Sequence, residues 1–322
     1  MITYTIVGAG WRSEFYLRIA ALMPKTFSVG GILVRNPAKR ARLSEKYGVK
    51  ICTSLEELLE IDCDFVVSCV SKGSIKETLK TLAASGVPVL SETPVADEDI
   101  GGRIQVAEQF RFAPRNCAYK AIIDSGILGA VHQVQLSCCH DYHAASLIRF
   151  FLDTGFELPQ VTAVTLPDSV MRYNGRGGPA ASPAVVQAEE SIRILQFRDK
   201  TAVYDFSREQ YFSDIRASRI VIRGERGEIV DNTCTYLEGG IPQRFTLHRS
   251  TCGSEENLDG FSLLRITGNG NVLYKSPFPG ARLSDEEIAV ATCLVKMKAY
   301  ADGEDAFYSV KDAAFDCRLL QD

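Results

Sequence analysis

A chain of 322 residues with 46% hydrophobic and 24% charged side chains has the composition of an ordinary globular protein, and its length suits two domains. The net charge of -4, with both signs interspersed, provides no basic stripe for a run of phosphates, so we expect no nucleic-acid partner. No window approaches about 18 uninterrupted apolar residues and a strand pattern begins at Ile2, so we expect neither a membrane span nor a signal peptide, and a cytoplasmic location.

The first third of the chain alternates strand and helix patterns. The run at 64–70 is mostly apolar throughout, as expected when helices cover both faces of a parallel sheet. Repeated units of this size imply right-handed crossovers and a doubly wound parallel sheet. The predicted strands are 2–7, 27–34, 51–53, 64–70 and 87–90, and the predicted helices are 14–23, 37–47, one that begins after Ser54, and 74–85.

Beyond about residue 120 the pattern changes to short strands joined by turns, without helices long enough for parallel crossovers. A glycine-rich loop at 174–183 interrupts them. We therefore expect an α/β chain with a Rossmann domain over 1–120 and an α+β domain with a large, mostly antiparallel open sheet over 121–322. The predicted strands here are 132–137, 161–166, 191–197, 201–206, 219–224, 243–248, 262–267 and 271–274, and the predicted helices are 116–125, 285–301 and 310–320.

Gly8 and Gly10 stand where the first strand meets the first helix, which is the place of a dinucleotide-binding turn. The first glycine makes the tight turn, the second lets the backbone approach a pyrophosphate, and the helix N-terminus offers N–H groups. Ser13 replaces the third glycine of the pattern, at a position that tolerates small residues. Trp11 and Arg12 follow the glycines and are expected to flank the cofactor. An ordinary glycine-rich turn is the alternative.

The second strand ends where dinucleotide-binding folds place an acid against the adenosine ribose. Arg35 and Asn36 stand there instead, and Lys39 and Arg40 follow one turn into the next helix. Because this basic pocket suits a 2′-phosphate better than a bare ribose, we expect NADP to be preferred to NAD. The alternative for Lys39 is a solvated helix face.

A short motif, Glu92-Thr93-Pro94, follows the strand at 87–90. Together with the glycine turn and a histidine-bearing helix at the start of a mostly antiparallel second domain, it resembles the Gfo/Idh/MocA family, the glucose-fructose oxidoreductase and inositol dehydrogenase type. The family implies a Rossmann domain, an open-sheet domain and NAD(P)-dependent oxidation or reduction of sugars, polyols and related compounds. Further matching segments are 106–114, 124–129 and 303–313, so the resemblance spans essentially the whole chain.

Two positions depart from the family pattern. The usual motif is Glu-Lys-Pro, with the lysine near the nicotinamide and the reacting oxygen, whereas Thr93 stands in that place and carries no charge. The family's histidine matches His143, but Cys139 and Ser146 stand where acids are usual. Asp141 is a shifted substitute for the first of these acids.

His143 is the residue that we expect to donate or accept the proton while hydride passes to or from the nicotinamide, since an unperturbed imidazole titrates close to neutral pH. Asp141, Tyr142 or His140 is expected to orient it. A hydrogen-bonded histidine at a helix start is the alternative. Lys72 follows a strand at the carboxyl edge of the sheet and is a candidate to replace the missing charge, an exposed loop lysine being the alternative.

The predicted site has three parts. Candidates for catalysis are His143, Thr93, Asp141 and Lys72. Candidates for binding the cofactor are Gly8, Gly10, Trp11, Arg12, Ser13, Arg35, Asn36, Ser71, Glu92 and Thr93. Candidates for holding an anionic or polyhydroxylated substrate, all in or beside predicted loops or strand ends, are Arg111, Tyr142, Arg172, Tyr173, Tyr211 and Arg216.

Ten scattered cysteines form no C-x-x-C pair and are expected to be reduced, mostly buried side chains. Cys138 and Cys139 beside His140 and His143 have the composition of a metal cluster. Adjacent residues on a strand point to opposite faces, however, so we expect no metal site.

These features predict an NAD(P)-dependent oxidoreductase that transfers hydride between the nicotinamide and a sugar, a polyol or a related hydroxy or keto compound, with imine reduction as a variant. The missing lysine also suits a dinucleotide-binding sensor or a non-catalytic partner that keeps the fold. Because an open antiparallel sheet must cover its apolar face, we expect a homodimer or homotetramer.

Overall fold

A computed structural model describes residues 1–253 and 262–321, and in it segments far apart in the chain assemble into two units. Unit 1 consists of Met1–Asn116, Arg249–Arg265 and Lys275–Phe315, and unit 2 consists of Cys117–His248, Ile266–Tyr274 and Asp316–Asp322. Unit 1 thus takes in C-terminal segments that the predicted boundary near residue 120 left in the second domain. No local pattern shows such a return, because it depends on contacts with residues far earlier in the chain.

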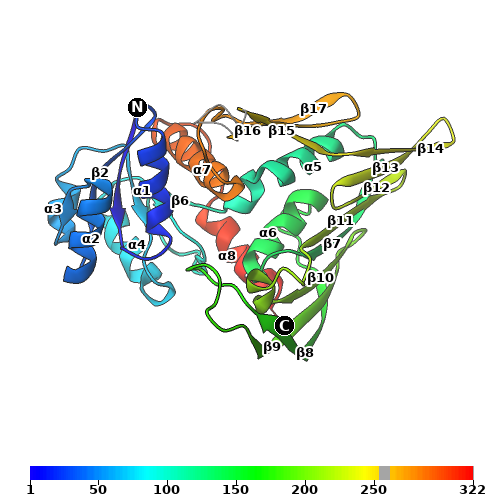
Figure 1. The fold of residues 1–322 in the computed structure, drawn as a ribbon, viewed down its shortest axis with the longest axis horizontal. Helices are drawn as coiled ribbons and strands as arrows, with labels where there is room; N and C mark the ends of the chain where they lie inside the picture. The colour runs from blue at the N-terminus through cyan, green and yellow to red at the C-terminus, as the bar shows by residue number, and fades with distance from the viewer. Residues whose placement is uncertain (254–261, 322) are drawn as a thin grey trace. The chain divides into compact units, whose positions relative to one another are not determined.

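Unit 1 contains a parallel sheet of six strands (Figure 1). The strands are β1 (Ile2–Val7), β2 (Phe27–Leu33), β3 (Ile51–Cys52), β4 (Phe65–Ser68), β5 (Val89–Ser91) and β6 (Ile104–Val106). Their order, β3-β2-β1-β4-β5-β6, is that of a doubly wound Rossmann sheet, so the predicted fold of this part is confirmed. The register pairs Val7 with Ser68 and Ser68 with Ser91, so β1, β4 and β5 end level with one another.

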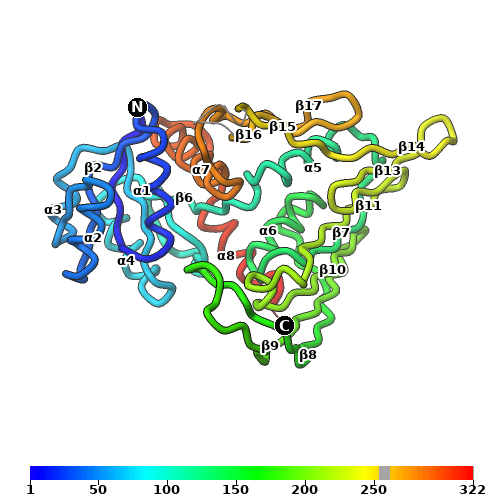
Figure 2. Tube along the Cα trace, in the orientation of Figure 1, coloured from blue at the N-terminus to red at the C-terminus, as the bar shows by residue number. Residues whose placement is uncertain are grey.

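The helices of unit 1 are α1 (Ser13–Leu22), α2 (Pro37–Tyr47), α3 (Leu55–Leu59), α4 (Ile75–Ala84) and α7 (Asp285–Ala301). α2 begins after Asn36, whose side chain caps it, and ends at Gly48, whose φ of 63° is a left-handed conformation that glycine adopts readily. α7 begins with a capping box formed by Ser284 and Glu287. Figure 2 follows the chain as it returns near its C-terminal end to lay α7 beside α1.

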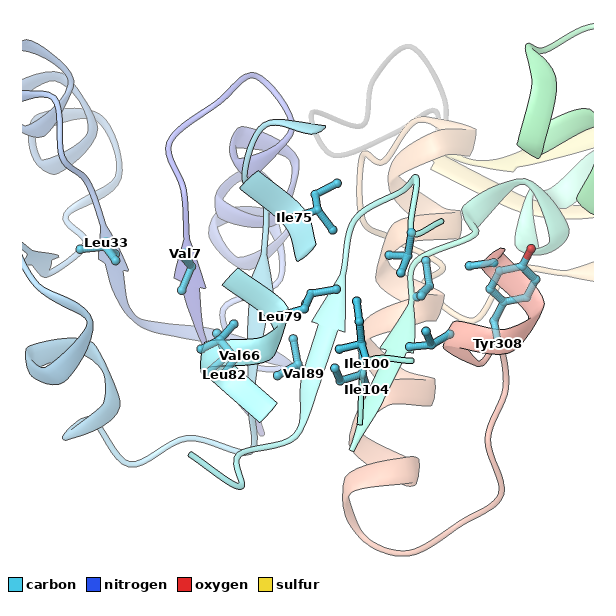
Figure 3. Close-up of a cluster of buried hydrophobic side chains, with 14 of the residues drawn as sticks. Val7, Leu33, Val66, Ile75, Leu79, Leu82, Val89, Ile100, Ile104 and Tyr308 are labelled. Carbon is cyan, nitrogen blue, oxygen red and sulfur yellow. The ribbon is translucent and has the colours of Figure 1, made fainter. Parts of the chain in front are cut away.

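An apolar core lies between the sheet of unit 1 and α4. Val66, Val89 and Ile104 come from the neighbouring strands β4, β5 and β6, and they cluster with Leu79 and Leu82 of α4 (Figure 3). Fully burying one side chain of this size contributes about 1.5–3 kcal/mol. This core holds the carboxyl ends of the strands in place, and the chain segments that follow those ends form the site described below.

Unit 2 contains a sheet of eight strands in the order β14-β13-β12-β11-β7-β10-β9-β8. β7 and β10 run parallel and the other pairs run antiparallel, so the predicted, mostly antiparallel sheet is confirmed. The strands are β7 (Val131–Ser137), β8 (Gln160–Arg172), β9 (Ala184–Gln196), β10 (Thr201–Ser207), β11 (Arg219–Gly224), β12 (Gly227–Val230), β13 (Thr233–Glu238) and β14 (Ile241–Thr246).

Helix α6 (Asp141–Leu152) follows β7 and packs against it (Figure 1). Alternate residues of the sheet are buried, among them Leu136, Leu195 and Ile222. β8 and β9 run well beyond the predicted stretches 161–166 and 191–197, as a hairpin whose 13 paired positions close on the glycine-rich loop.

A small sheet and two helices lie outside the two large sheets and the helices described so far. β15 (His248–Cys252), β16 (Ser262–Gly268) and β17 (Asn271–Lys275) form a small sheet in that order. α5 (Pro114–Asp124) and α8 (Val310–Leu319) lie close to their predicted bounds. Over residues 1–253 and 262–321, none of the helices is both long and apolar enough to cross a bilayer.

Candidate functional site

The turn after β1 contains two glycines with different surroundings. Gly8 has a φ of 105°, and a Cβ added there would lie 2.5 Å from the carbonyl oxygen of Cys69, so the protein itself requires glycine. At Gly10 the nearest atom to an added Cβ, again the Cys69 oxygen, is 3.9 Å away, which is an ordinary contact. The buried Ser13 donates a hydrogen bond of 2.6 Å to the Gly10 carbonyl and closes the turn onto α1. Within the part of the chain that the structure describes, nothing therefore requires Gly10 to lack a side chain.

Arg12, at the N-cap of α1, carries the most heavily paired charge of this turn. Its Nε lies 3.0 Å from Oε2 of Glu92 and its Nη1 lies 2.5 Å from Oε1 of Glu286, while the guanidinium stacks over the ring of Phe15 at 4.7 Å. Tyr16 donates a hydrogen bond to the other oxygen of Glu92. Two residues predicted to bind the cofactor thus bind each other, and the partners Tyr16 and Glu286 were not predicted.

The electrostatics of this cluster follow from its burial. Desolvation lowers the pKa of Arg12, but the negative charge of Glu92 and the contribution of Glu286 outweigh it and raise the pKa above its usual value. Desolvation and the charge of Glu92 raise the pKa of Tyr16, so its hydroxyl stays protonated as a donor. The cluster fixes the turn after β1 to the segment after β5.

The remaining residues at this edge of the sheet are more open. Thr93 is partly buried and follows Glu92 directly. Ser71 and Lys72 follow the carboxyl end of β4 and are exposed, with the hydroxyl of Ser71 3.2 Å from that of Ser74. Because β1, β4 and β5 end level, the structure brings the glycine turn, the segment at 69–72 and the Glu92-Thr93 pair to one edge, where ligands of doubly wound sheets bind.

The polar and basic residues after β2 differ in their contacts with the backbone. Asn36 caps α2 by accepting hydrogen bonds from Ala38 N–H at 2.9 Å and Lys39 N–H at 3.4 Å. Arg40 donates to the carbonyl oxygens of Val34 and Arg35. The Nζ of Lys39 reaches the carbonyl oxygen of Ala9 at 2.8 Å, so it lies at the glycine turn, and the Arg35 side chain is exposed.

His143 lies in the first turn of α6 in unit 2, and its side chain is buried. Its ring centroid is 4.4 Å from that of Tyr142 and 5.2 Å from that of His140. Nδ1 of His140 lies 2.9 Å from the hydroxyl of Tyr211 and Nε2 lies 3.0 Å from the hydroxyl of Tyr142. Three of the predicted site residues, Tyr142, His143 and Tyr211, are therefore in one aromatic cluster with His140, which was a candidate to orient His143.

Asp141 occupies a strained position at the start of α6. Its φ of 37° falls in the left-handed region that a residue with a side chain seldom adopts, and its N–H donates to the hydroxyl of Tyr204 at 3.1 Å. Burial raises the pKa of Tyr204, as it does that of Tyr211. Tyr204 was not predicted as part of the site, since it lies within an ordinary strand pattern.

Cys138 and Cys139 do not lie on a strand, so the argument from strand alternation is wrong for them. β7 ends at Ser137, and both cysteines follow in a bend. Their Sγ atoms are 3.7 Å apart, on the same side of the chain. In the described part of the chain no group of three or more metal-ligating side chains is arranged to hold a metal ion.

The predicted substrate residues of unit 2 lie around a short 3-10 helix, Arg208–Phe212. Arg172 forms an ion pair with Glu209 of this helix at 2.5 Å, and Tyr211 of the same helix binds His140. The hydroxyl of Tyr173 accepts a hydrogen bond from Asp214 N–H.

The other two predicted arginines have partners elsewhere. The guanidinium of Arg216 pairs with Asp168 at 2.7 Å. That of Arg111, in unit 1, lies over the ring of Tyr308 at 5.5 Å.

Comparison with known proteins gives one family and a common fold. A family model described as an oxidoreductase family with an NAD-binding Rossmann fold matches residues 2–110. No curated protein matches. Solved structures match over 99% of this chain, and at identities of 14–15% this likeness shows the fold.

Three of these structures illustrate the match. An oxidoreductase from Agrobacterium radiobacter in complex with NAD+, L-tartaric acid and magnesium is 14% identical, covered over 94% of its length, with a TM-score of 0.70. Levoglucosan dehydrogenase in complex with NADH and levoglucosan is 15% identical, covered over 96%, with a TM-score of 0.67. An NAD-binding oxidoreductase from Klebsiella pneumoniae is 14% identical, covered over 95%, with a TM-score of 0.66.

Proposed function

Since the Rossmann unit of this chain belongs to the Gfo/Idh/MocA oxidoreductase family, we propose that the protein transfers hydride between a nicotinamide cofactor and a sugar, a polyol or a related hydroxy or keto compound. Similar structures hold NAD+ with L-tartaric acid and NADH with levoglucosan, which supports this substrate class. Imine reduction is a variant of the same chemistry.

The observation that carries the cofactor assignment is the difference between Gly8 and Gly10. The first is required by the backbone of Cys69, whereas the nearest atom of the described residues to an added Cβ at Gly10 is the Cys69 oxygen, 3.9 Å away. A glycine that the protein does not need fits a ligand whose pyrophosphate approaches the backbone at the N-terminus of α1. The aromatic ring of Trp11 and the positive charge of Lys39 lie at the same turn and suit a dinucleotide, which carries flat rings and negative phosphates.

The nicotinamide, when bound, supplies or accepts the hydride. The accompanying proton is moved by an imidazole nitrogen of His143, a buried side chain in contact with the rings of Tyr142 and His140. The bond between His140 and the Tyr211 hydroxyl holds this cluster together. Thr93 donates one hydrogen bond near the reacting oxygen.

The substrate is held by polar side chains of the same cluster. Tyr142 and Tyr211 present hydroxyls beside the histidines, a chemistry suited to a polyhydroxylated ligand. Arg172 and Glu209 brace the short helix that carries Tyr211.

Cofactor binding is tested through the only tryptophan of the chain, Trp11, which is 45% exposed at the glycine turn. Titration with NADPH or NADH is expected to quench its fluorescence. A panel of sugars, polyols and keto compounds is then assayed by the absorbance of the reduced nicotinamide. Turnover supports the oxidoreductase. Binding without turnover across the panel supports a sensor or non-catalytic partner, an alternative that the uncharged Thr93 favours. If neither NADPH nor NADH binds, both the oxidoreductase and the dinucleotide-binding sensor are contradicted.

His143→Asn is expected to lower kcat by about 10²–10⁴-fold, the usual contribution of a positioned acid or base, with unchanged cofactor affinity. Steady-state kinetics on the best substrate of the panel measures this effect. The control is His132→Asn, an exposed histidine on β7, which is expected to retain activity. Unchanged turnover in His143→Asn would show that another group moves the proton.

The preference for NADP rests on Arg35, with Lys39 beside it at the turn. Arg35→Ala is expected to weaken NADPH binding by about 10- to 150-fold, since a charged hydrogen bond contributes about 1.5–3 kcal/mol, and to leave NADH binding unchanged. Fluorescence titration of Trp11 measures both affinities. Arg42→Ala, which removes a charge already paired with Glu14, is the control. Tighter binding of NADH than of NADPH to the unaltered protein would contradict the preference.

A further inference from the structure

Two adjacent thiols stand between the end of β7 and the start of α6, and the proposed hydride transfer does not use them. Cys138 and Cys139 follow the last residue of β7 and precede His140, the N-cap of α6. Their Sγ atoms are 3.7 Å apart, so one thiol lies within hydrogen-bond distance of the other. The bend after β7 thus places both sulfurs on the same side of the chain.

The two thiols differ in their access to solvent. Cys138 is half-buried, whereas Cys139 is fully buried. A small reagent in solution therefore reaches Cys138 first, and the buried sulfur of Cys139 lies 3.7 Å from that of Cys138. The sulfurs need to approach from 3.7 Å to about 2.05 Å to form a bond, which rotation of the two side chains and a small backbone adjustment can supply.

We propose that Cys138 and Cys139 are a redox-active vicinal dithiol that a low-molecular-weight disulfide, such as glutathione disulfide, converts reversibly to an intramolecular disulfide. The Cys138 thiolate attacks one sulfur of glutathione disulfide, forms a mixed disulfide and releases one glutathione thiolate. The Cys139 thiolate then attacks Sγ of Cys138, forms the second disulfide and releases the other glutathione. The protein loses two protons and two electrons, and glutathione disulfide gains them to become two glutathione thiols.

The geometry favours a labile bond rather than a structural one. Adjacent Cα atoms across a trans peptide are about 3.8 Å apart, whereas disulfide-linked Cα atoms are usually about 4.4–6.8 Å apart. The ring formed by neighbouring cysteines is therefore strained, and strained disulfides are the more easily reduced ones. A thiol reductant is expected to reopen it.

The location of the pair connects its redox state to the aromatic cluster of His140, Tyr142, His143 and Tyr211. Cys139 is joined directly to His140, whose N–H donates to the Tyr211 hydroxyl at 3.0 Å. Closing the ring turns the peptide that precedes His140 and weakens this bond. The N-terminal turn of α6, which carries His143, is expected to exchange its amide hydrogens faster in the oxidised protein.

The test uses the full chain, reduced, freed of reductant and incubated with excess glutathione disulfide. Intact-mass measurement is expected to show the loss of two hydrogens, and peptide mapping is expected to place the new bond within the peptide that contains both cysteines. Dithiothreitol is expected to restore the original mass. Hydrogen exchange is compared at the α6 N-terminus between the reduced and the oxidised protein. Equal exchange rates would overturn the connection to the aromatic cluster.

Single substitutions separate the two steps. Cys139→Ser is expected to stop at a stable glutathione adduct on Cys138, and Cys138→Ser is expected to lose the reaction. Cys63→Ser, which changes a half-buried thiol of unit 1, is the matched control and is expected to behave like the unaltered protein. A wild-type protein that accumulates the adduct without closing the ring, or that pairs Cys138 with another cysteine, would overturn the proposal.

A dithiol reagent gives an independent readout. Phenylarsine oxide forms two As–S bonds to neighbouring thiols and releases one water. Stoichiometric binding is expected for the wild type and Cys63→Ser, and loss of binding for Cys138→Ser and Cys139→Ser. Equal binding by all four proteins would contradict a vicinal dithiol. None of these measurements requires turnover, so their outcome is separate from that of the proposed hydride transfer.

Discussion

Gly8 and Gly10 are two residues apart, yet different neighbours determine what each position tolerates. Gly8→Ala places a Cβ 2.5 Å from the Cys69 oxygen in a left-handed backbone, and is expected to cost more than about 1–2 kcal/mol of unfolding free energy. Gly10→Ala is expected to change that free energy by less than about 0.5 kcal/mol but to abolish cofactor binding. Thermal unfolding and Trp11 fluorescence measure the two effects. A Gly10→Ala protein that binds NADPH normally would remove the main support for the cofactor assignment.

At this scale the sequence predicts the residues whose neighbours are close in the chain. The glycine turn follows from a strand, two glycines and a helix in succession, and the cluster around His143 lies largely within four consecutive residues. The partner of Arg12 is different, because Glu286 is 274 positions away and no local pattern connects the two. The Cys138-Cys139 contact was missed because the alternation of a strand was applied to two residues that follow its end at Ser137.

Among the helices, α1 and α2 are joined by one carboxylate. Glu14 of α1 accepts hydrogen bonds from Arg42 at 2.6 Å and from Lys46 at 3.0 Å, both on α2. The bond from Arg42, against the opposing effect of partial burial and with the help of Lys46, lowers the pKa of Glu14 to about 2. A carboxyl whose pKa is lower in the folded than in the unfolded state stabilises the fold above its ordinary pKa and loses that contribution as the pH falls.

Glu14→Gln is therefore expected to lower the free energy of unfolding by about 1 kcal/mol near pH 7, the sum of two partly exposed pairs. The difference in unfolding free energy between the variant and the wild type is full above pH 4.5 and shrinks as the pH falls towards 2. Urea unfolding near pH 7 and near pH 3 measures it. Glu45→Gln, an exposed residue of α2, is the control and is expected to show little difference at either pH. A Glu14→Gln difference that is equally large near pH 3 would exclude the ion pairs as its cause.

Elements stabilised by their own local sequence were predicted accurately, and elements stabilised mainly by pairing with another strand were not. α7 matches its predicted bounds because Ser284 and Glu287 mark its start within the helix itself. β12 and β13 were missed. β8 and β9 were predicted too short, because most residues in the outer parts of the β8–β9 hairpin are exposed or half-buried and do not alternate strictly between polar and apolar. Those parts are held by pairing with a neighbouring strand, along 13 positions in the β8–β9 hairpin, and pairing leaves no hydrophobic pattern in the strand's own sequence.

For the whole molecule, the open face of the sheet in unit 2 supports our proposal of a homodimer or homotetramer. Cross-strand pairing places Ile194 beside Val203, and Val164 and Leu166 on the same face of the hairpin. Val164, Leu166 and Ile194 are each between 43% and 46% exposed. Apolar side chains in neighbouring positions of an open sheet face are typical of a surface that a second copy covers.

Ile194→Lys is expected to convert the oligomer to a monomer, since it places a charge among the exposed apolar side chains of β8 and β9. Light scattering during gel filtration measures the mass. Ile215→Glu, which changes an exposed apolar residue outside the sheet, is the control and is expected to leave the mass unchanged. A monomeric wild-type protein would contradict the oligomer directly.

The pairing of Arg12 with Glu286 also determines when unit 1 is completed during synthesis. The ribosome makes the glycine turn among its first products and makes Glu286 274 residues later, about 14–55 s afterwards at about 5–20 residues per second. Unit 2 is translated almost entirely within that interval. The first unit in the sequence therefore acquires all its contacts only near the end of synthesis, and a nascent chain released before α7 carries Arg12 and Glu92 without their third partner.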